Sequence, residues 1–148
     1  MLALPATAAG LTLGHCDATG ALQLGESLGV TLGVTYALKY GINETRPDGG
    51  PDRGNGQSFP SAHASVSFSS AEFIRKRYGW IYGGPSYALA TFVAYSRVEA
   101  REHYIHDVAA GAAIGILSSY LFAKPYKGVD VRLETDGKYY GLNFKIKW

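Results

Sequence analysis

The sequence SRVEAREHYIHD, residues 96–107, places two arginines, two histidines and an aspartate directly before a long apolar stretch. Asp107 lies four residues after His103, so on a helix its carboxylate can accept the Nδ1 proton of that imidazole. The contact would fix the tautomer and leave Nε2 free as a nucleophile, as the orienting acid does in catalytic triads. A plainer interpretation is a solvated helix start, where acidic side chains favour the helix dipole.

Two other polar clusters interrupt the apolar segments. Lys39 and Arg46 belong to KYGINETRP, and Ser61 and His63 belong to PSAH, which follows a glycine-rich stretch. Together with Arg97 they supply three cations and a helix N-terminus, whose free N–H groups can bind an anion. Arginine binds phosphate oxygens bidentately, and lysine adds a point charge. Taken singly, Lys39 could simply end a helix, Arg46 could be a loop charge and His63 could cap its own helix. Together the residues indicate a phosphate-binding site.

Uncharged stretches indicate the helices that must position these groups. The expected helices cover about residues 2–14, 21–40, 61–78, 78–96 and 108–123. Gly83-Gly84-Pro85 is expected to interrupt the fourth, and Gly111 and Gly115 on the last allow another helix to approach closely. Residues 46–60, rich in glycine and proline, form a long loop. A membrane span needs about 20 apolar residues, so these helices are either core helices of a bundle or short spans.

The character of the chain changes after Pro125. Apolar and polar residues alternate on both sides of Asp136-Gly137, which is the pattern of two strands joined by a tight turn. The predicted fold is mainly α: a compact bundle of about five helices with the active site at one end, plus a C-terminal β-hairpin. We expect residues 1–124 to form the helical domain and residues 125–148 the hairpin extension. We expect the hairpin either to pack on the helical body or to pair with a copy of itself, which would give an oligomer.

Composition narrows the classes of function. A formal net charge of +2 is too small to argue for a nucleic-acid partner. Cys16 is the only cysteine, which excludes an internal disulfide and a cysteine-based zinc site. The pattern supplies cations from side chains and no carboxylate cluster, so neither a metal nor another cofactor is expected. The N-terminal segment lacks a basic region and makes a poor signal peptide, so the natural chain is expected to begin earlier.

The order and spacing of the three clusters resemble the signature of the type 2 phosphatidic acid phosphatase family. This family includes bacterial class A acid phosphatases and is related to vanadium haloperoxidases, and its signature is K-x6-R-P, P-S-G-H and S-R-x5-H-x3-D. Residues 39–47 match the first part and residues 96–107 match the third in full. Residues 60–63 match the second apart from Ala62, which keeps the N–H of the family's glycine but requires a negative φ, as at a helix start.

The resemblance implies a role for each histidine. His103 attacks phosphorus and forms a phosphohistidine, with Asp107 orienting its ring. His63 is the general acid that protonates the leaving alkoxide and later the base that activates water, duties that suit a group with a pKa of about 6.5. His106 matches no position of the signature and is assigned a structural role.

The resemblance also implies a phosphate cradle. Its cations stabilise the charge that develops on the phosphoryl oxygens, and hydroxyl and backbone N–H groups complete the set. The predicted phosphate-binding residues are Lys39, Arg46, Arg97, Ser61 and Ala62.

The function that follows is a metal-independent phosphatase acting on a phosphomonoester or diphosphate of a lipid or isoprenoid. The membrane-associated branch of the family and the short apolar helices favour a lipid substrate, at a membrane and facing the bacterial periplasm. The alternatives are a soluble nonspecific acid phosphatase acting on small phosphomonoesters and a vanadate-dependent haloperoxidase, for which the chain is short. A non-catalytic anion-binding relative fits poorly, because the nucleophile and acid positions are both intact.

Overall fold

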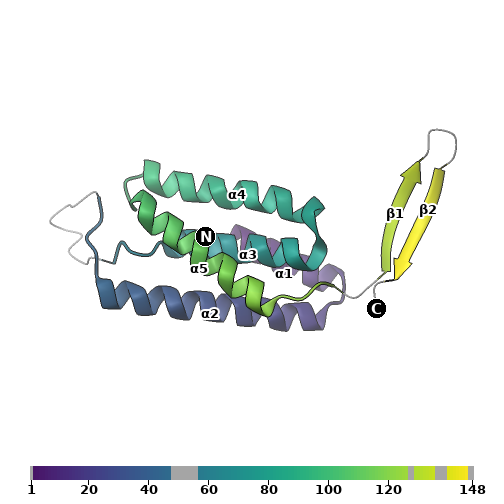
Figure 1. Ribbon diagram of the computed structural model, residues 1–148, viewed down its shortest axis with the longest axis horizontal. Helices are drawn as coiled ribbons and strands as arrows, with labels where there is room; N and C mark the ends of the chain where they lie inside the picture. The colour runs from purple at the N-terminus through teal and green to yellow at the C-terminus, as the bar shows by residue number, and fades with distance from the viewer. Residues whose placement is uncertain (1, 48–56, 127–128, 136–139, 147–148) are drawn as a thin grey trace.

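The computed structural model describes residues 2–47, 57–126, 129–135 and 140–146. Within these ranges the chain forms five helices (Figure 1): α1 (Ala3–Gly14), α2 (Ala18–Ile42), α3 (Ala62–Tyr78), α4 (Trp80–Glu99) and α5 (Ile105–Phe122). The prediction of a mainly helical fold with about five helices is confirmed.

Side-chain caps determine where α2 and α3 begin. Asp17 accepts a hydrogen bond from the Gly20 N–H at 2.9 Å, and Ser61 accepts one from the Ala64 N–H at 3.5 Å. Such caps satisfy N–H groups that have no acceptor within the helix. At its other end α2 stops at Asn43, which adopts the left-handed conformation common after a helix, with φ 50° and ψ 45°.

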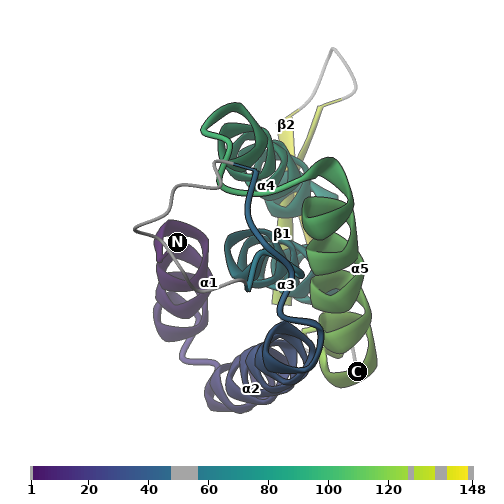
Figure 2. The same cartoon turned by 90° about the vertical axis from the view of Figure 1, so that its left-hand side faces the viewer.

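Helix α3 lies at the centre of the bundle. Figure 2 shows α1, α2, α4 and α5 arranged around it. The small side chains of the segment ASVSFSSA allow this, since α3 is buried along most of its length. Every other helix packs on α3. The packing on α3 therefore sets where the ends of the neighbouring helices lie.

Two glycines bring α5 into backbone contact with α3. A Cβ added at Gly111 would lie 2.5 Å from the carbonyl oxygen of Ser61, and one at Gly115 would lie 2.1 Å from that of Ser65. Neither position leaves room for a side chain. The close approach lets the Ser61 N–H donate to the Asp107 carbonyl oxygen at 3.0 Å. The small-residue face expected on this helix thus joins the start of α5 to the start of α3.

Hydroxyl groups join the helices along the middle of the bundle. Thr31 donates to Ser69 at 3.1 Å and Thr35 donates to Ser65 at 3.0 Å, which links α2 to α3. The hydroxyls of Ser69 and Ser119 lie 2.9 Å apart and link α3 to α5. All five side chains are almost fully buried, so these bonds satisfy groups that would otherwise be costly to remove from water.

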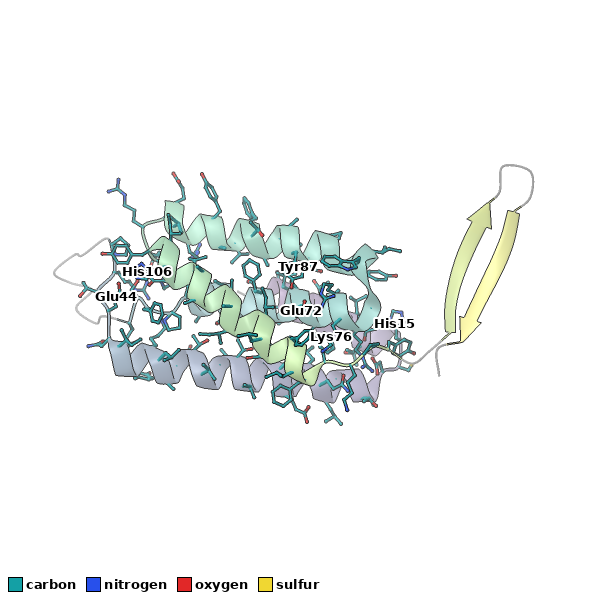
Figure 3. The ribbon with its side chains drawn as sticks, in the orientation of Figure 1. His15, Glu44, Glu72, Lys76, Tyr87 and His106 are labelled. Carbon is teal, nitrogen blue, oxygen red and sulfur yellow. The ribbon has the colours of Figure 1, made fainter. Side chains whose placement is uncertain are left out.

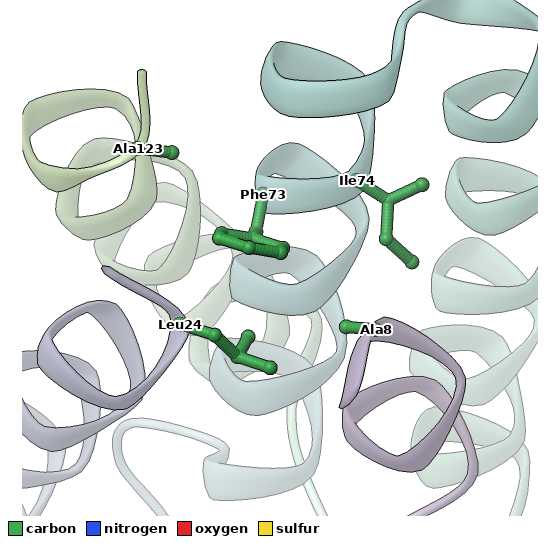
Figure 4. Packing of buried hydrophobic residues seen from close by; sticks show 5 residues of the cluster. All are labelled: Ala8, Leu24, Phe73, Ile74 and Ala123. Carbon is green, nitrogen blue, oxygen red and sulfur yellow. The ribbon is translucent and has the colours of Figure 1, made fainter. Parts of the chain in front are cut away.

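An apolar cluster lies toward the C-terminal half of α3. Figure 4 shows its members, contributed by α1, α2, α3 and the residue that follows α5: Ala8, Leu24, Phe73, Ile74 and Ala123. Burying a side chain of the size of Phe73 stabilises the fold by about 1.5–3 kcal/mol. The cluster holds the bundle together at the end away from the polar helix termini.

Helix α4 is continuous, so the interruption expected at Gly83-Gly84-Pro85 was wrong. Pro85 lies inside the helix. A proline ring disfavours the helical conformation of the residue before it by clashing with that residue's backbone N–H and Cβ, and Gly84 has no Cβ. Gly83 lies against α3, where an added Cβ would be 2.6 Å from the Cβ of Arg75. The two glycines therefore allow the helix to accommodate the proline while packing closely on α3.

Two antiparallel strands follow the bundle in the chain, β1 (Val129–Thr135) and β2 (Tyr140–Ile146), with Val131 opposite Phe144. The turn predicted at Asp136-Gly137 lies outside the described residues. The hairpin as an extension of the fold, the boundary after residue 124 and association through this segment stay predictions.

Candidate active site

The polar ends of four helices meet at one end of the bundle, at the left of Figure 1. Helices α2 and α4 end there, and α3 and α5 begin there. The predicted site residues all lie in these termini or in the segments that join them: Lys39, Arg46, Ser61, Ala62, His63, Arg97, His103 and Asp107. The fold thus brings three motifs that are far apart in sequence to the same end of the molecule.

His103 and Asp107 form the buried centre of this region. The side chains of His103 and Asp107 are 4% and 0% exposed, and His103 Nδ1 lies 3.4 Å from Asp107 Oδ2. The spacing suggested that the two residues share a helix. They do not, because α5 begins at Ile105 and His103 precedes it. Asp107 lies in the first turn of α5, where its Oδ2 also accepts the Tyr104 N–H at 2.9 Å. The carboxylate therefore caps the helix and contacts the imidazole.

Ser58 is a third member of this centre that the sequence did not indicate. Its side chain is fully buried, and its hydroxyl donates to Asp107 Oδ2 at 2.5 Å and lies 3.5 Å from His103 Nδ1. The hydroxyl thus shares one carboxylate oxygen with the imidazole. A serine after a glycine-rich stretch of sequence carries no spacing signal toward an aspartate 49 residues later, so only the folded chain reveals the contact.

Lys39 approaches the centre from the last turn of α2. Its side chain is almost fully buried, and Nζ donates to the carbonyl oxygens of Gln57 and Ser58, the latter at 3.4 Å. Burial lowers the pKa of Lys39, Arg46 lowers it further, and Asp107 opposes the change. Lys39 therefore holds the residues that precede α3 against the end of α2 while supplying positive charge near His103.

Arg46 is paired within the protein. Its guanidinium donates to the carboxylate of Glu102, and both side chains are about one third or less exposed. In the sequence Glu102 directly precedes His103 and follows Arg101. In the fold this carboxylate occupies donors of Arg46 that are predicted to bind phosphate.

His63 and Arg97 face the same region from α3 and α4. His63 lies in the first turn of α3 and is partly buried. Burial lowers its pKa, and the positive charge of Arg97 lowers it further. The Arg97 side chain contacts its neighbour Ser96, with Nε 3.4 Å from the hydroxyl oxygen. The backbone carbonyl oxygen of Arg97 accepts the His103 N–H at 3.3 Å. The Arg97 backbone thus supports the position of His103.

The start of α3 supplies backbone donors. Ser61 is the N-cap, with its hydroxyl directed to the Ala64 N–H, and Ala62 is the first residue of the helix. The first N–H groups of a helix have no intrahelical acceptor and suit an anion. The alanine in place of the family's glycine is accommodated in helical backbone, as the sequence predicted.

The charges around His103 favour its neutral form. Burial lowers the pKa of this imidazole, and Lys39 and Arg46 lower it further, against an opposing effect of Asp107. A protonated imidazole has no lone pair to attack with, so a lowered pKa extends the range of pH in which the ring can act as a nucleophile.

Replacing Ser58 with alanine should lower kcat by roughly 10-fold, the effect of losing one hydrogen bond to a charged group. The hydroxyl helps to hold the Asp107 carboxylate that faces His103, so KM should change little. Ser70→Ala is the matched control, because Ser70 is equally buried but bonds to the Val66 carbonyl oxygen within α3. Steady-state kinetics on both variants would contradict the role of Ser58 if their kcat values fell equally.

Comparison with known families places this geometry in context. The PAP2 superfamily profile matches residues 20–127, which include every motif residue from Lys39 to Asp107. The chain belongs to the PAP2 superfamily. The resemblance seen in the spacing of the motifs is therefore confirmed, and the match covers α2 to α5.

Several curated bacterial proteins are similar to this PAP2 chain. A lipid A 4′-phosphatase of Helicobacter pylori is 36% identical over 99 residues, which are 62% of this chain and 50% of that protein. A lipid A 4′-phosphatase of Bacteroides thetaiotaomicron is 37% identical over 89 residues, 57% of this chain and 38% of that protein. The bacitracin transport permease protein BcrC of Bacillus licheniformis is 42% identical over 65 residues, 42% of this chain and 30% of that protein.

This PAP2 chain spans half or less of the length of these relatives. No solved structure matches it.

Proposed function

We propose that the chain is a phosphatase that hydrolyses a phosphate ester of a lipid through a phosphohistidine on His103. The observation that carries the proposal is the buried contact of His103 with Asp107 at a helix end lined by Lys39, Arg46 and Arg97. Two of its relatives are lipid A 4′-phosphatases, which supports a lipid phosphate as the substrate class.

The reaction proceeds in two displacements. In the first, His103 Nε2 attacks phosphorus and forms the N–P bond, the ester P–O bond breaks, and His63 gives its proton to the departing alkoxide. In the second, water attacks phosphorus, the N–P bond breaks, and His63 takes the proton of the water. Asp107 stabilises the Nδ1–H of His103 throughout.

The cradle stabilises the charge on the phosphoryl oxygens in both steps. Lys39, Arg46 and Arg97 supply positive charge, and Ser61 and the Ala62 N–H supply hydrogen-bond donors. Arg46 binds Glu102 in the absence of substrate, so substrate binding exchanges one anionic partner of this arginine for another.

Membrane association is supported by the distribution of apolar side chains. Large apolar residues lie on the outside of the helices, such as Phe92 at 66% exposure on α4 and Leu121 at 73% on α5, whereas serine and threonine hydroxyls are bonded inside. In lipid, small residues and hydrogen bonds between helices take over from the hydrophobic effect. Among the described residues, α5 is a helix long and apolar enough to cross a membrane. We propose a membrane-associated enzyme that faces the periplasm.

Turnover of a lipid phosphate in detergent should persist in EDTA, because the proposed cradle stabilises the phosphoryl charge with side-chain cations. The measurement is phosphate release from a lipid A phosphate, phosphatidic acid and undecaprenyl diphosphate, beside a small chromogenic phosphomonoester. A lipid ester should have the higher kcat/KM, and vanadate should inhibit competitively as a mimic of the transition state. Loss of activity in EDTA that magnesium restores would contradict the mechanism, and preference for the small ester would indicate a nonspecific acid phosphatase.

A further inference from the structure

Three potential metal ligands meet beside the proposed active site. Glu44 follows α2, and His106 and Asp107 lie in the first turn of α5. Their ligand atoms all lie within 4.8 Å of one another. Figure 3 shows Glu44 and His106 together at the end of the bundle where the motifs meet. Neither residue belongs to the phosphatase signature, and the mechanism above uses neither.

The imidazole nitrogen of His106 cannot satisfy both of the carboxylate oxygens beside it. His106 Nε2 lies 2.9 Å from Glu44 Oε1 and 3.1 Å from Asp107 Oδ1, and a single N–H can serve only one of them well. The hydrogen-bond geometry is satisfied toward Glu44. Asp107 Oδ1 is fully buried, and no hydrogen-bond donor among the described residues satisfies it. A buried carboxylate oxygen directed at an imidazole nitrogen and a second carboxylate would be stabilised by a cation.

We propose that Glu44, His106 and Asp107 bind a divalent transition-metal ion of the zinc class. Imidazole nitrogen and carboxylate oxygen are both ligand types that bind zinc, and three protein ligands leave the fourth position to water. Tetrahedral bonds of the usual zinc lengths place ligand atoms about 3.3 Å apart. The separations of 2.9 Å and 3.1 Å are close to this value. The Glu44 and His106 side chains are both partly exposed, so they have room to adjust around an ion.

Neighbouring groups already hold two of the ligands in place. The His106 ring stacks on Tyr104, with centroids 5.3 Å apart and planes within 9°, and lies 5.9 Å from the Phe59 ring. Asp107 Oδ2 is fixed by the Tyr104 N–H and the Ser58 hydroxyl. Such contacts orient metal ligands before the ion arrives and raise affinity. They also leave Oδ1 as the free oxygen of this carboxylate.

The ion would inhibit the phosphatase, a consequence that rests on the proposed function. Asp107 faces His103 through Oδ2 and the cluster through Oδ1. A cation on Oδ1 withdraws electron density from the same carboxylate, so this group becomes a weaker acceptor for the Nδ1 proton of His103. The ion acts through a positioning residue and does not replace any group that contacts substrate.

Direct binding tests the site without reference to activity. Isothermal titration of the full chain in detergent with zinc chloride should show one site per chain. His106→Ala and Glu44→Gln should each weaken binding by at least about 10-fold, the lower end of what ligand-shell changes cost. His15→Ala is the matched control, because His15 is an exposed histidine at the opposite end of the bundle (Figure 3) and should bind zinc as the original chain does.

Two results of the titration would overturn the site. The first is no zinc binding by the original chain. The second is unchanged binding by both His106→Ala and Glu44→Gln, which would assign the ion to other residues such as His63 and His103. Two variants are used because Glu44→Gln keeps the shape of its side chain, and it tests the site even if His106→Ala does not fold.

Inhibition is measured separately. Zinc at saturating concentration should lower kcat by at least about 10-fold in the original chain and in His15→Ala, and EDTA should reverse the effect. Glu44→Gln should need at least about 10-fold more zinc for the same inhibition. Zinc that binds at these residues and leaves kcat unchanged would overturn the inhibitory role, whereas a chain without phosphatase activity that still binds zinc would contradict only the proposed function.

Discussion

His103→Ala should abolish turnover, with a loss of about 10⁴-fold or more, the scale seen when the nucleophile of a covalent hydrolase is removed. The physical reason is that Nε2 of His103 is the proposed attacking atom, and Nδ1 of the same ring lies 3.4 Å from the buried Asp107 carboxylate. The measurement is phosphate trapped on the protein by rapid quenching after mixing with a labelled substrate. Phosphohistidine is labile in acid and stable in base, which distinguishes it from phosphoserine.

The control for this experiment is His15→Ala, which removes an exposed histidine remote from the site and should trap as much phosphate as the original chain. Label that persists undiminished in His103→Ala would assign the covalent step to another residue. In that case the chain could still be a phosphatase, but the division of roles would be wrong.

His63→Ala should separate the two halves of the reaction. A substrate with a good leaving group scarcely needs a proton, so it should still phosphorylate His103, and the phosphoenzyme should then accumulate because no base activates water. With a lipid ester, whose alkoxide is a poor leaving group, turnover should fall by about 10²–10⁴-fold, the usual contribution of general acid catalysis. Burst kinetics with a chromogenic ester and steady-state assays with a lipid phosphate measure the two effects.

The pH dependence provides a second readout for His63. Burial and Arg97 lower its pKa, so the protonated form that acts as the acid is lost as pH rises through a value below the ordinary pKa of about 6.5. The pKa of His103 is also lowered, so its neutral form persists to lower pH. Activity on a lipid ester should therefore be highest in acid. In His63→Ala the alkaline decline should disappear, and a decline that persists would mean that another group is the acid.

The sequence predicted which residues gather at one end of the bundle because their spacing is tied to helix ends. Lys39 and Arg97 fall in the last turns of α2 and α4, and Ser61 falls at the cap of α3. These positions follow from local rules: where apolar runs stop, where a serine can cap and where glycine breaks a helix. The number of helices could be predicted on the same basis.

Contacts between distant segments could not be predicted in this way. The Ser58 hydroxyl meets Asp107 across 49 residues, and Arg46 meets Glu102 across 56. No periodicity links such pairs, since they depend on how helices far apart in the sequence pack together. The continuity of α4 through Pro85 was missed for a related reason: a local rule about proline was outweighed by two glycines and by packing on α3.

The contact of Gly111 and Gly115 with α3 also fixes the position of Asp107, because all three residues belong to the same rigid helix. These glycines lie four and eight residues after Asp107, about 6 Å and 12 Å along a helix that rises about 1.5 Å per residue. Since backbone meets backbone there, α5 has little freedom to slide or roll. A methyl group at residue 115 would push α5 away from α3, and the same movement would draw the Asp107 carboxylate away from the His103 imidazole. Substitutions at Gly115 are therefore limited by the geometry of the active site, about two helical turns away.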